Sequence, residues 1–573
     1  MDAQLPGQYG RILMLHCYRT ISSILGVLLL SLPIFPERPF FPAAHPASVL
    51  SRIEERESIT ETVFRALPAE SSAAIDLSSV PQRLYIRRFP EECRIEAAGF
   101  QLIRRPELDE RYYHAYETIG FQPDSGNGEH AIRFTNPGYV ASTLIFSEHS
   151  RNRSSGVEPV HSVEETENGV FLEIKLERDP RRSLMRYQGS LETGSQPKSL
   201  LFHPRGEMLF AALLAGYGVD MFSWQGEPAA GNIFHTPLHI PGENSAGGRS
   251  SSSGFVEMGF DSARDQLWVS QMTTGQVHVL DIPLAQVAAS IETGGRWSKV
   301  ISFDHGKEFA FVSNWLSGNI SVISTGNRSL LGHIPTGGIP RGLALAPDNS
   351  RLFAADYADG RLLSFHLEPL YENVETSAPA DPSDREVGAL VPDILDSGPG
   401  AKRHIVISRE RNRAYVSDMM YGRIHGYDLS SGEEVVRRYV GPKLNTIVLD
   451  PGEEFLYVSS RGRNNPDSYL IPGPDFGKIY VLDAVTLELV DWTWGANQPT
   501  GLAISPDGRT LAFSDFLDDR IELYDVSALS AVNPLLRWSL RYRNKVLQMF
   551  DGGDELPAPM KLIQKHAETG TAR

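Results

Sequence analysis

From about residue 197 onward, apolar and polar positions alternate in short segments, and this arrangement recurs seven times. The last copy is the clearest, with residues 499–515 reading Pro-Thr-Gly-Leu-Ala-Ile-Ser-Pro-Asp-Gly-Arg-Thr-Leu-Ala-Phe-Ser-Asp. In each copy, apolar residues stand three and five positions after the start, so both lie on one face of a strand. The starts are Pro197, Phe255, Ser298, Pro340, Lys402, Leu444 and Pro499.

Each copy has a second fixed position, here called the anchor, sixteen residues after its start. The anchors are Leu213, Gln271, Asn314, Asp356, Asp418, Ser460 and Asp515. The basic repeat is about 42 residues long, and three copies carry insertions. Short strands in units of about 40 residues are typical of four-stranded blades packed around an axis. We therefore predict an all-β protein with a seven-bladed β-propeller over residues 179–545, followed by a C-terminal tail at 546–573.

A further strand is needed to close the ring, because an open propeller would leave a sheet edge unpaired. Residues 183–194 match the outer strand that ends a repeat, yet they precede the first copy. We predict that they complete the seventh blade. Residues 534–543 are the alternative for that place.

The chain before the repeats divides into three parts. An uncharged run from Thr20 to Pro36 follows basic residues and precedes small ones, which is the layout of a signal peptide or an uncleaved signal anchor over residues 1–47. Residues 48–80 are polar and then rich in Ser and Ala, which predicts a linker. Residues 81–178 contain short apolar segments that predict a small β-sandwich-like domain. Both interpretations of residues 1–47 place the protein outside the cytoplasm, in the periplasm or at the cell surface. An uncleaved segment would tether it to the inner membrane.

Several phrases of the repeats resemble the YVTN family of propellers, which is related to lactonase-like propellers. They are Ser-Pro-Asp-Gly at 505–508, Val-Ser-Asn at 312–314 and Gly-Gln-Val-His-Val-Leu-Asp at 275–281. The resemblance implies the propeller fold, whereas unrelated activities share that fold. Residues 128–139 resemble the end of a PEGA domain, a small β-module of bacterial envelope proteins.

Composition and motifs exclude several classes of partner and cofactor. The net charge of −17 argues against nucleic acid as a partner, because binding phosphates needs a basic surface. The two cysteines, Cys17 and Cys93, form no haem-attachment or zinc motif. No nucleophile elbow, zinc helix or P-loop stands in a usable context. His235 and His239 are four residues apart, but outside a helix they would not share a face. We therefore predict no cofactor and no metal.

The residue after each start lies where the inner strand of a blade enters the central channel. These residues are Lys198, Val256, Lys299, Arg341, Arg403, Asn445 and Thr500, and four of the seven are basic. We hypothesise a cationic collar that binds a carboxylate, a phosphate or a polyanionic glycan, with His404 and Ser199 adding hydrogen bonds. In the alternative, the anchors Asp356, Asp418 and Asp515 pair with these cations and tie neighbouring blades together.

The three insertions, at 242–254, 371–400 and 461–477, are expected on the collar side, where loops on a rigid scaffold serve recognition. Tyr469 and Phe476 in the third are candidate contact residues, and the alternative is disordered decoration.

The sequence thus favours a non-catalytic envelope protein that binds an anionic small molecule, a glycan or an envelope protein. A lactonase-like hydrolase acting on a sugar lactone is the alternative, although that family's acid and base residues cannot be placed here. A quinone- or haem-dependent oxidoreductase is a third interpretation.

Overall fold

The computed structural model describes most of residues 70–531, with gaps at 77–82, 120–129, 137–140, 148–159, 225–231, 242–252 and 374–386 and a few shorter ones. The predicted signal or anchor at 1–47 and the predicted tail at 546–573 lie outside the described residues. So do residues 534–543, the alternative closing strand. Among the helices that are described, none is both long and apolar enough to cross a membrane.

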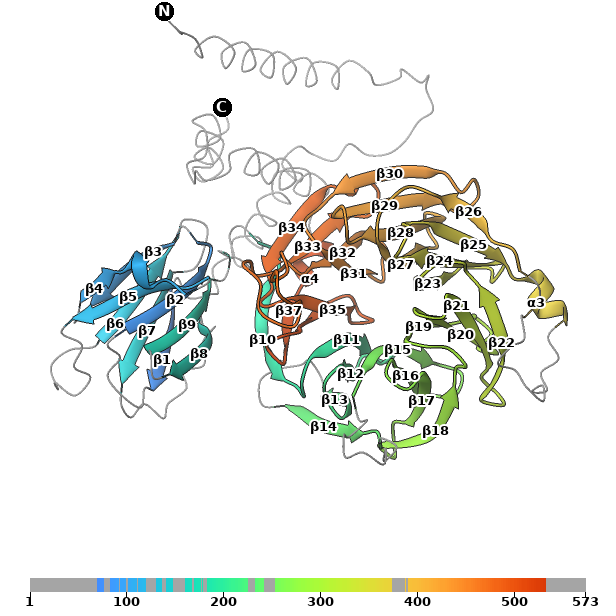
Figure 1. Cartoon of the computed structure of the whole chain (residues 1–573), viewed down its shortest axis with the longest axis horizontal. Coiled ribbons are helices and arrows are strands. Elements are labelled where there is room, and N and C mark those ends of the chain that lie inside the picture. The colour runs from blue at the N-terminus through green and yellow to red at the C-terminus, as the bar shows by residue number, and fades with distance from the viewer. Residues whose placement is uncertain are drawn as a thin grey trace, which may run out of the picture. The chain divides into compact units, whose positions relative to one another are not determined.

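Seven four-stranded antiparallel sheets form a β-propeller around one axis (Figure 1). Blade 1 consists of β11 (Pro197–Phe202), β12 (Met208–Leu213), β13 (Gly218–Trp224) and β14 (Ile233–His239). Blade 2 consists of β15 (Phe255–Asp261), β16 (Gln266–Gln271), β17 (Gln276–Asp281) and β18 (Gln286–Glu292). Blade 3 consists of β19 (Ser298–Phe303), β20 (Phe309–Asn314), β21 (Asn319–Ser324) and β22 (Ser329–Pro335). Blade 4 consists of β23 (Pro340–Leu345), β24 (Arg351–Asp356), β25 (Leu362–His366) and β26 (Asp393–Asp396).

The remaining blades complete the ring. Blade 5 consists of β27 (Lys402–Ser408), β28 (Arg413–Asp418), β29 (Arg423–Asp428) and β30 (Glu434–Tyr439). Blade 6 consists of β31 (Leu444–Leu449), β32 (Phe455–Ser460), β33 (Lys478–Asp483) and β34 (Leu489–Trp494). Blade 7 consists of β35 (Pro499–Ile504), β36 (Thr510–Asp515), β37 (Arg520–Asp525) and β10 (Arg186–Glu192), and α4 (Ser527–Ala531) follows it.

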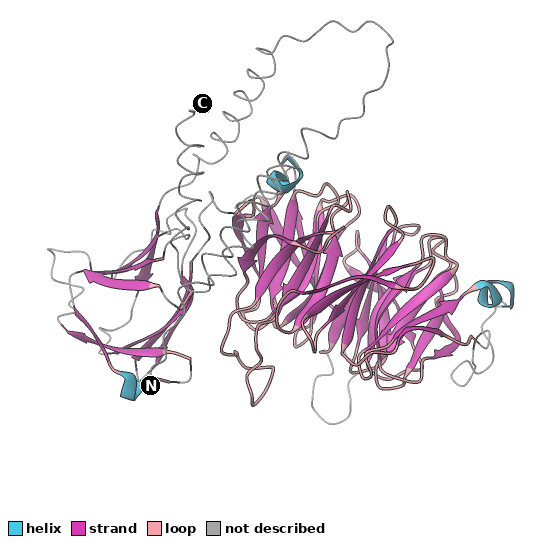
Figure 2. Cartoon of the chain, turned by 90° about the horizontal axis from the view of Figure 1, so that it is seen from above, coloured by secondary structure: helices cyan, strands magenta, loops and turns pink. Residues whose placement is uncertain are grey.

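The repeat phase predicted from the sequence matches the strand register. In all seven blades the start residue pairs with the anchor residue, as Lys402 does with Asp418. Closure is confirmed as well, because β10 pairs antiparallel with β37, Arg186 opposite Asp525. The strands run between two faces of the propeller, and the turns and loops lie at their ends (Figure 2). One face therefore carries the start of every inner strand and the turn after every second strand.

The second insertion differs from the prediction. In blade 4 the outer strand β26 begins at Asp393, so most of residues 371–400 connect the third strand to the fourth. Helix α3 (Glu368–Asn373), where that connection begins, lies on the face opposite the collar. The prediction was wrong because β26 is short and polar and does not stand out from a loop in the sequence.

Residues 70–178 form a separate β-domain of two sheets. One sheet has the order β1 (Glu70–Asp76), β7 (Ala141–Ser147), β6 (His130–Thr135) and β3 (Arg94–Ala98). The other has the order β4 (Gln101–Arg104), β5 (His114–Ile119), β2 (Arg83–Phe89), β9 (Gly169–Lys175) and β8 (Val160–Thr166), and a short 3-10 helix, η1 (Pro106–Leu108), lies between β4 and β5. Ile132 and Phe134 of the first sheet share a core with Leu84 and Leu172 of the second, as a sandwich requires. Strand β1 lies within residues 48–80, for which the sequence predicts a linker, because its Ser- and Ala-rich residues show little apolar alternation.

The propeller core lies between blades, since each of six apolar clusters draws its residues mainly from two neighbouring sheets. Serines one position before the anchor add a polar tie. The hydroxyl groups of Ser270, Ser313, Ser417 and Ser459 donate to the carbonyl groups of Lys299, Arg341, Asn445 and Thr500, at 2.6, 3.0, 2.9 and 3.2 Å. Each of these carbonyls belongs to the collar position of the next blade, so the ties fix the collar backbone.

Replacing Ser417 with alanine should test such a tie. Ser417 Oγ donates to Asn445 and accepts from the backbone N–H of His404 at 3.2 Å, and the residue is fully buried. The variant leaves both backbone groups without this partner, so we expect the free energy of unfolding to fall by about 1–3 kcal/mol in urea titrations. Ser430→Ala, at an exposed turn of the same blade, is the matched control.

Candidate functional site

The inner strands reach the channel through a distortion that is common to all blades. Immediately after each start residue the pairing of the first two strands shifts register. Such bulges re-aim side chains, often beside functional sites. Here the bulge involves the collar position and, in four blades, the position after it as well.

The structure brings the four predicted collar cations together. All four residues are buried, and each has at most 9% of its surface exposed. They are Lys198, Lys299, Arg341 and Arg403. Burial lowers the pKa of Lys198 well below its usual value, and the charges of Arg461, Arg403, Lys299 and Arg341 lower it further. These charges act on one amine, so the cations from blades 1, 3, 4 and 5 face a shared space.

A fifth cation, Arg461, belongs to the same group and was missed in the sequence. It is the first residue of the third insertion, directly after the anchor Ser460, and it is 5% exposed. Its guanidinium donates to the side chain of Gln498 and lies 5.5 Å from the ring centre of Tyr469. Burial lowers its pKa. The signal was present, because the corresponding residues in five other copies are Met272, Trp315, Tyr357, Met419 and Phe516.

Among the described residues, one carboxylate accompanies these five basic side chains. Glu257, two positions after the start of blade 2, accepts a hydrogen bond from Arg341 of blade 4 at 2.5 Å. Burial opposes ionisation of Glu257, but the charge and hydrogen bond of Arg341 and the charge of Arg403 help to outweigh burial, so the pKa of Glu257 is lowered. The sequence hypothesis did not include Glu257.

The anchor aspartates do not pair with the collar cations. Asp356 bonds Arg361 at 2.9 Å, while Asp418 and Asp515 accept from the backbone N–H groups of Met420 and Ala496, both at 2.8 Å. The start residue Lys402, which precedes Arg403, pairs with Asp396 at 3.0 Å. The described contacts therefore disagree with the alternative in which anchors neutralise the collar.

The cations have mainly aromatic and sulfur neighbours. Lys299 Nζ lies 2.6 Å from Met272 Sδ and 4.8 and 5.4 Å from the ring centres of Trp315 and Trp297. Burial, together with the charges of Arg341 and Arg403, lowers the pKa of Lys299 to about 6. Lys198 Nζ lies 4.4 Å from the ring centre of Phe516. Within the described part of the chain, no group accepts a hydrogen bond from the Arg403 guanidinium, and burial lowers the pKa of that group.

The two remaining predicted residues are His404, which is half-buried, and Asn445, which is buried. His404 is neutral at physiological pH because burial lowers its pKa to about 4. Asn445 donates from Nδ2 to the carbonyl of Thr500 at 3.1 Å. Several buried polar atoms have no hydrogen-bond partner among the described residues, namely Ser199 Oγ, His404 Nδ1, Asn445 Oδ1, and Nε and Nη1 of Arg341.

The third insertion also contacts the β-domain. Phe476 is 2% exposed and stacks on Phe89 of β2 with ring centres 4.1 Å apart, so it does not serve as a ligand contact. Arg87 of β2 donates to the carbonyl of Gly473 at 2.7 Å and to Asn497 at 3.0 Å, and it pairs with Glu173 at 2.6 Å. The third insertion is therefore ordered and contacts the β-domain, which disagrees with the alternative of disordered decoration.

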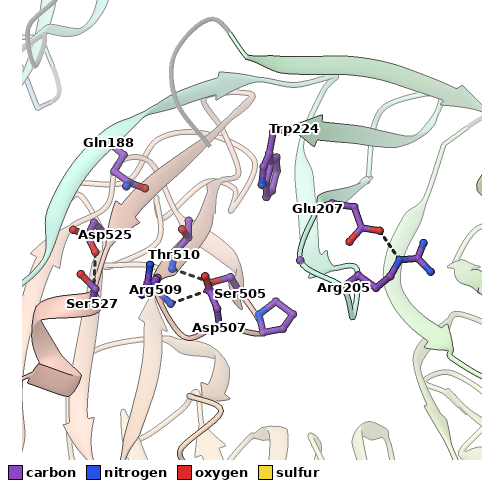
Figure 3. Close-up of a pocket in the computed structure, with 12 residues that line it drawn as sticks. Gln188, Arg205, Glu207, Trp224, Ser505, Asp507, Arg509, Thr510, Asp525 and Ser527 are labelled. Carbon is purple, nitrogen blue, oxygen red and sulfur yellow. Dashed lines mark hydrogen bonds and ion pairs between the residues drawn. The ribbon is translucent and has the colours of Figure 1, made fainter. Parts of the chain in front are cut away.

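A cavity of about 290 Å³ lies between blades 7 and 1, on the face opposite the collar (Figure 3). Its polar groups are largely paired with one another. Arg205 bonds Glu207 at 2.7 Å, Ser505 accepts from the Thr510 N–H at 2.9 Å, and Asp507 accepts from the Arg509 N–H at 3.1 Å. These contacts stabilise the turns that line the cavity, so it lacks the excess charge of the collar.

No group of three metal-ligating side chains occurs in the described regions. His235 and His239 lie on β14. The first bonds Asp220 at 2.7 Å, and the second stacks on Tyr217 with ring centres 4.4 Å apart.

Comparison with known proteins gives one relative at substantial identity. Antigen Lp49 of Leptospira interrogans serogroup Icterohaemorrhagiae serovar copenhageni is 34% identical over 347 residues, which are 59% of this chain and 69% of the antigen. No family model matches the chain. Among solved structures, the WD40 propeller domain of Doa1 has a TM-score of 0.44 at 10% identity, over 60% of this chain and 97% of that one. Hydrazine synthase of Kuenenia stuttgartiensis has a TM-score of 0.44 at 16% identity, over 59% and 98%.

Proposed function

Because this chain belongs to the family of the leptospiral antigen Lp49, we propose that it is an exported, surface-located binding protein whose propeller holds an anionic ligand at the collar. The relative is an antigen, which supports a location at the cell surface. The basic side chains of the collar support a negatively charged ligand. The ligand-binding residues of the proposal are Lys198, Lys299, Arg341, Arg403 and Arg461, with His404 and Asn445 beside them.

The observation that carries the proposal is the charge imbalance of the collar. Five buried basic side chains face one carboxylate among the described residues, Glu257, and the three arginines alone outnumber it above pH 6, where Lys299 is neutral. Placing an ion in the protein interior costs several kcal/mol unless an opposite charge compensates it. A bound anion would supply the missing charge, and perturbed groups clustered in this way are typical of functional sites.

Binding of inorganic sulfate to the purified protein tests the proposal. Since a ligand that binds only the folded state stabilises it by about 2.7 kcal/mol at one hundred times its Kd, sulfate should raise the Tm, whereas chloride at equal ionic strength should not. An unchanged Tm together with no heat of binding in calorimetry would contradict an anion site.

The affinity for sulfate should fall as the pH rises above about 6. In the free protein the pKa of Lys299 is about 6, so its amine is charged below that pH and neutral above it. A bound anion favours the charged amine, so binding above pH 6 requires uptake of a proton and becomes weaker with each further pH unit. Calorimetry between pH 5.5 and 8.5, in buffers of different ionisation enthalpy, measures both effects.

The Lys299→Gln variant is the control for this pH dependence. It should bind sulfate more weakly at pH 5.5 and show a flatter profile. His404 does not contribute in this range, because its pKa is about 4. Equal affinity of the unmodified protein at pH 5.5 and 8.5 would be inconsistent with a titrating collar lysine.

A further inference from the structure

We infer that the collar recognises an acidic saccharide, a ligand that carries hydroxyl groups and a flat sugar face as well as its anionic group. This inference rests on the proposed anion site and names the chemical class of its ligand. Two sets of observations carry it, the unpartnered polar atoms of the collar and the aromatic side chains at its mouth.

The unpartnered atoms of the collar include acceptors as well as donors. Nε and Nη1 of Arg341 are donors, and Asn445 Oδ1 is an acceptor. Ser199 Oγ can act either way, and so can His404 Nδ1, according to the ring's tautomer. All five atoms are buried. A bare anion offers only acceptors, so it would satisfy Arg341 and leave the Asn445 oxygen without a partner. A hydroxyl group donates and accepts, so a hydroxylated acid can satisfy both kinds of atom.

The mouth of the collar carries a cluster of aromatic side chains on blades 3 and 4. Trp297 and Trp315 have ring centres 6.0 Å apart with their planes at 89°, and Trp315 lies 5.1 Å from Tyr357. Trp297 is 42% exposed, whereas Trp315 lies against the Lys299 amine. The apolar face of a pyranose ring packs on an exposed indole, because both present flat C–H and π surfaces. The cluster therefore places a stacking surface next to a cation.

The residue before an inner strand has a left-handed backbone in several blades. Trp297 has a φ of 60°, and the equivalent residues Gln196, Lys443 and Gln498 have φ values of 60°, 50° and 62°. The conformation therefore belongs to the turn of the repeat, and in blade 3 the residue that this turn carries is an exposed indole.

Calorimetry with four probes tests the inference. Glucuronate should bind at least tenfold more tightly than acetate or sulfate, and glucose should bind too weakly to measure. Trp297→Ala should weaken glucuronate binding at least fivefold and leave sulfate binding unchanged. Tyr439→Ala is the control, because this aromatic residue is 65% exposed at the end of the outer strand β30.

The acceptor is tested separately by Asn445→Leu and Ser199→Ala. Both variants should weaken glucuronate binding more than they weaken sulfate binding, and measurable sulfate binding shows that the collar still folds. If sulfate binds as tightly as glucuronate, the inference is overturned while the anion site stands. If neither probe binds, the proposed function fails, and the inference fails with it. If glucose binds as tightly as glucuronate, the charge has no role in recognition and both are overturned.

Discussion

The triple variant Lys299→Met, Arg341→Met, Arg403→Met should lose at least a hundredfold in affinity for sulfate. Removing one partner of a buried charged hydrogen bond costs about 2–5 kcal/mol, and three cations are removed here. The measurement is the Kd from calorimetry at pH 5.5, where the amine of Lys299 is largely charged.

Lys402→Met is the matched control for the triple variant. Lys402 precedes Arg403 on β27 and is 1% exposed, but it pairs with Asp396. This variant should lower stability and retain sulfate affinity. Retained affinity in the triple variant with a lower Tm would favour a structural role for the collar cations. In contrast, we expect Arg403→Met alone to raise the Tm in the absence of ligand, since it removes a buried charge with no described hydrogen-bond partner.

Arg87→Met should lower the free energy of unfolding by about 3–5 kcal/mol, the cost of leaving a buried charge unpaired. Arg87 and Glu173 are 2% and 4% exposed, and the arginine also bonds Asn497 and Gly473 of the propeller. The loss should release the β-domain from blades 6 and 7. Urea titration gives the stability, and limited proteolysis between residues 176 and 186 reports the release.

An exposed ion pair of the same β-domain provides the comparison. Arg105 bonds Glu117 at 2.8 Å on the surface, and such pairs contribute little, so Arg105→Met should leave stability and proteolysis unchanged. If Arg87→Met is as stable and as resistant as the unmodified protein, the contacts of Arg87 do not hold the β-domain in place.

The strand pattern predicts the propeller well because every blade repeats the same phase of apolar residues. Starts and anchors can be read directly, and they pair as expected in all seven blades. A strand that lacks this apolar pattern cannot be predicted from the sequence. Strand β26 is short and polar, so the insertion of blade 4 was placed on the wrong face. Strand β1 is rich in Ser and Ala, so its segment was read as a linker.

The repeat pattern predicts only some residues of the candidate site. Lys198, Lys299, Arg341 and Arg403 share one repeat position, and their grouping follows from symmetry. Glu257 and Arg461 occupy other positions, and their approach to the group depends on the bulge and on the course of the third insertion. The anchor aspartates do not pair with the collar cations because their side chains point elsewhere. The spacing of residues in the sequence does not determine that direction.

The pairing of β10 with β37 has a consequence for synthesis and export. A ribosome makes β10 before any complete blade and β37 after nearly all of the propeller. Until β37 is made, β10 has no strand to pair with, and its unpaired edge can associate with other chains. The nascent protein therefore needs protection, by delayed folding or by a chaperone, until its last sheet has emerged. Any truncation that removes β35 to β37 should leave a chain that aggregates instead of a smaller propeller.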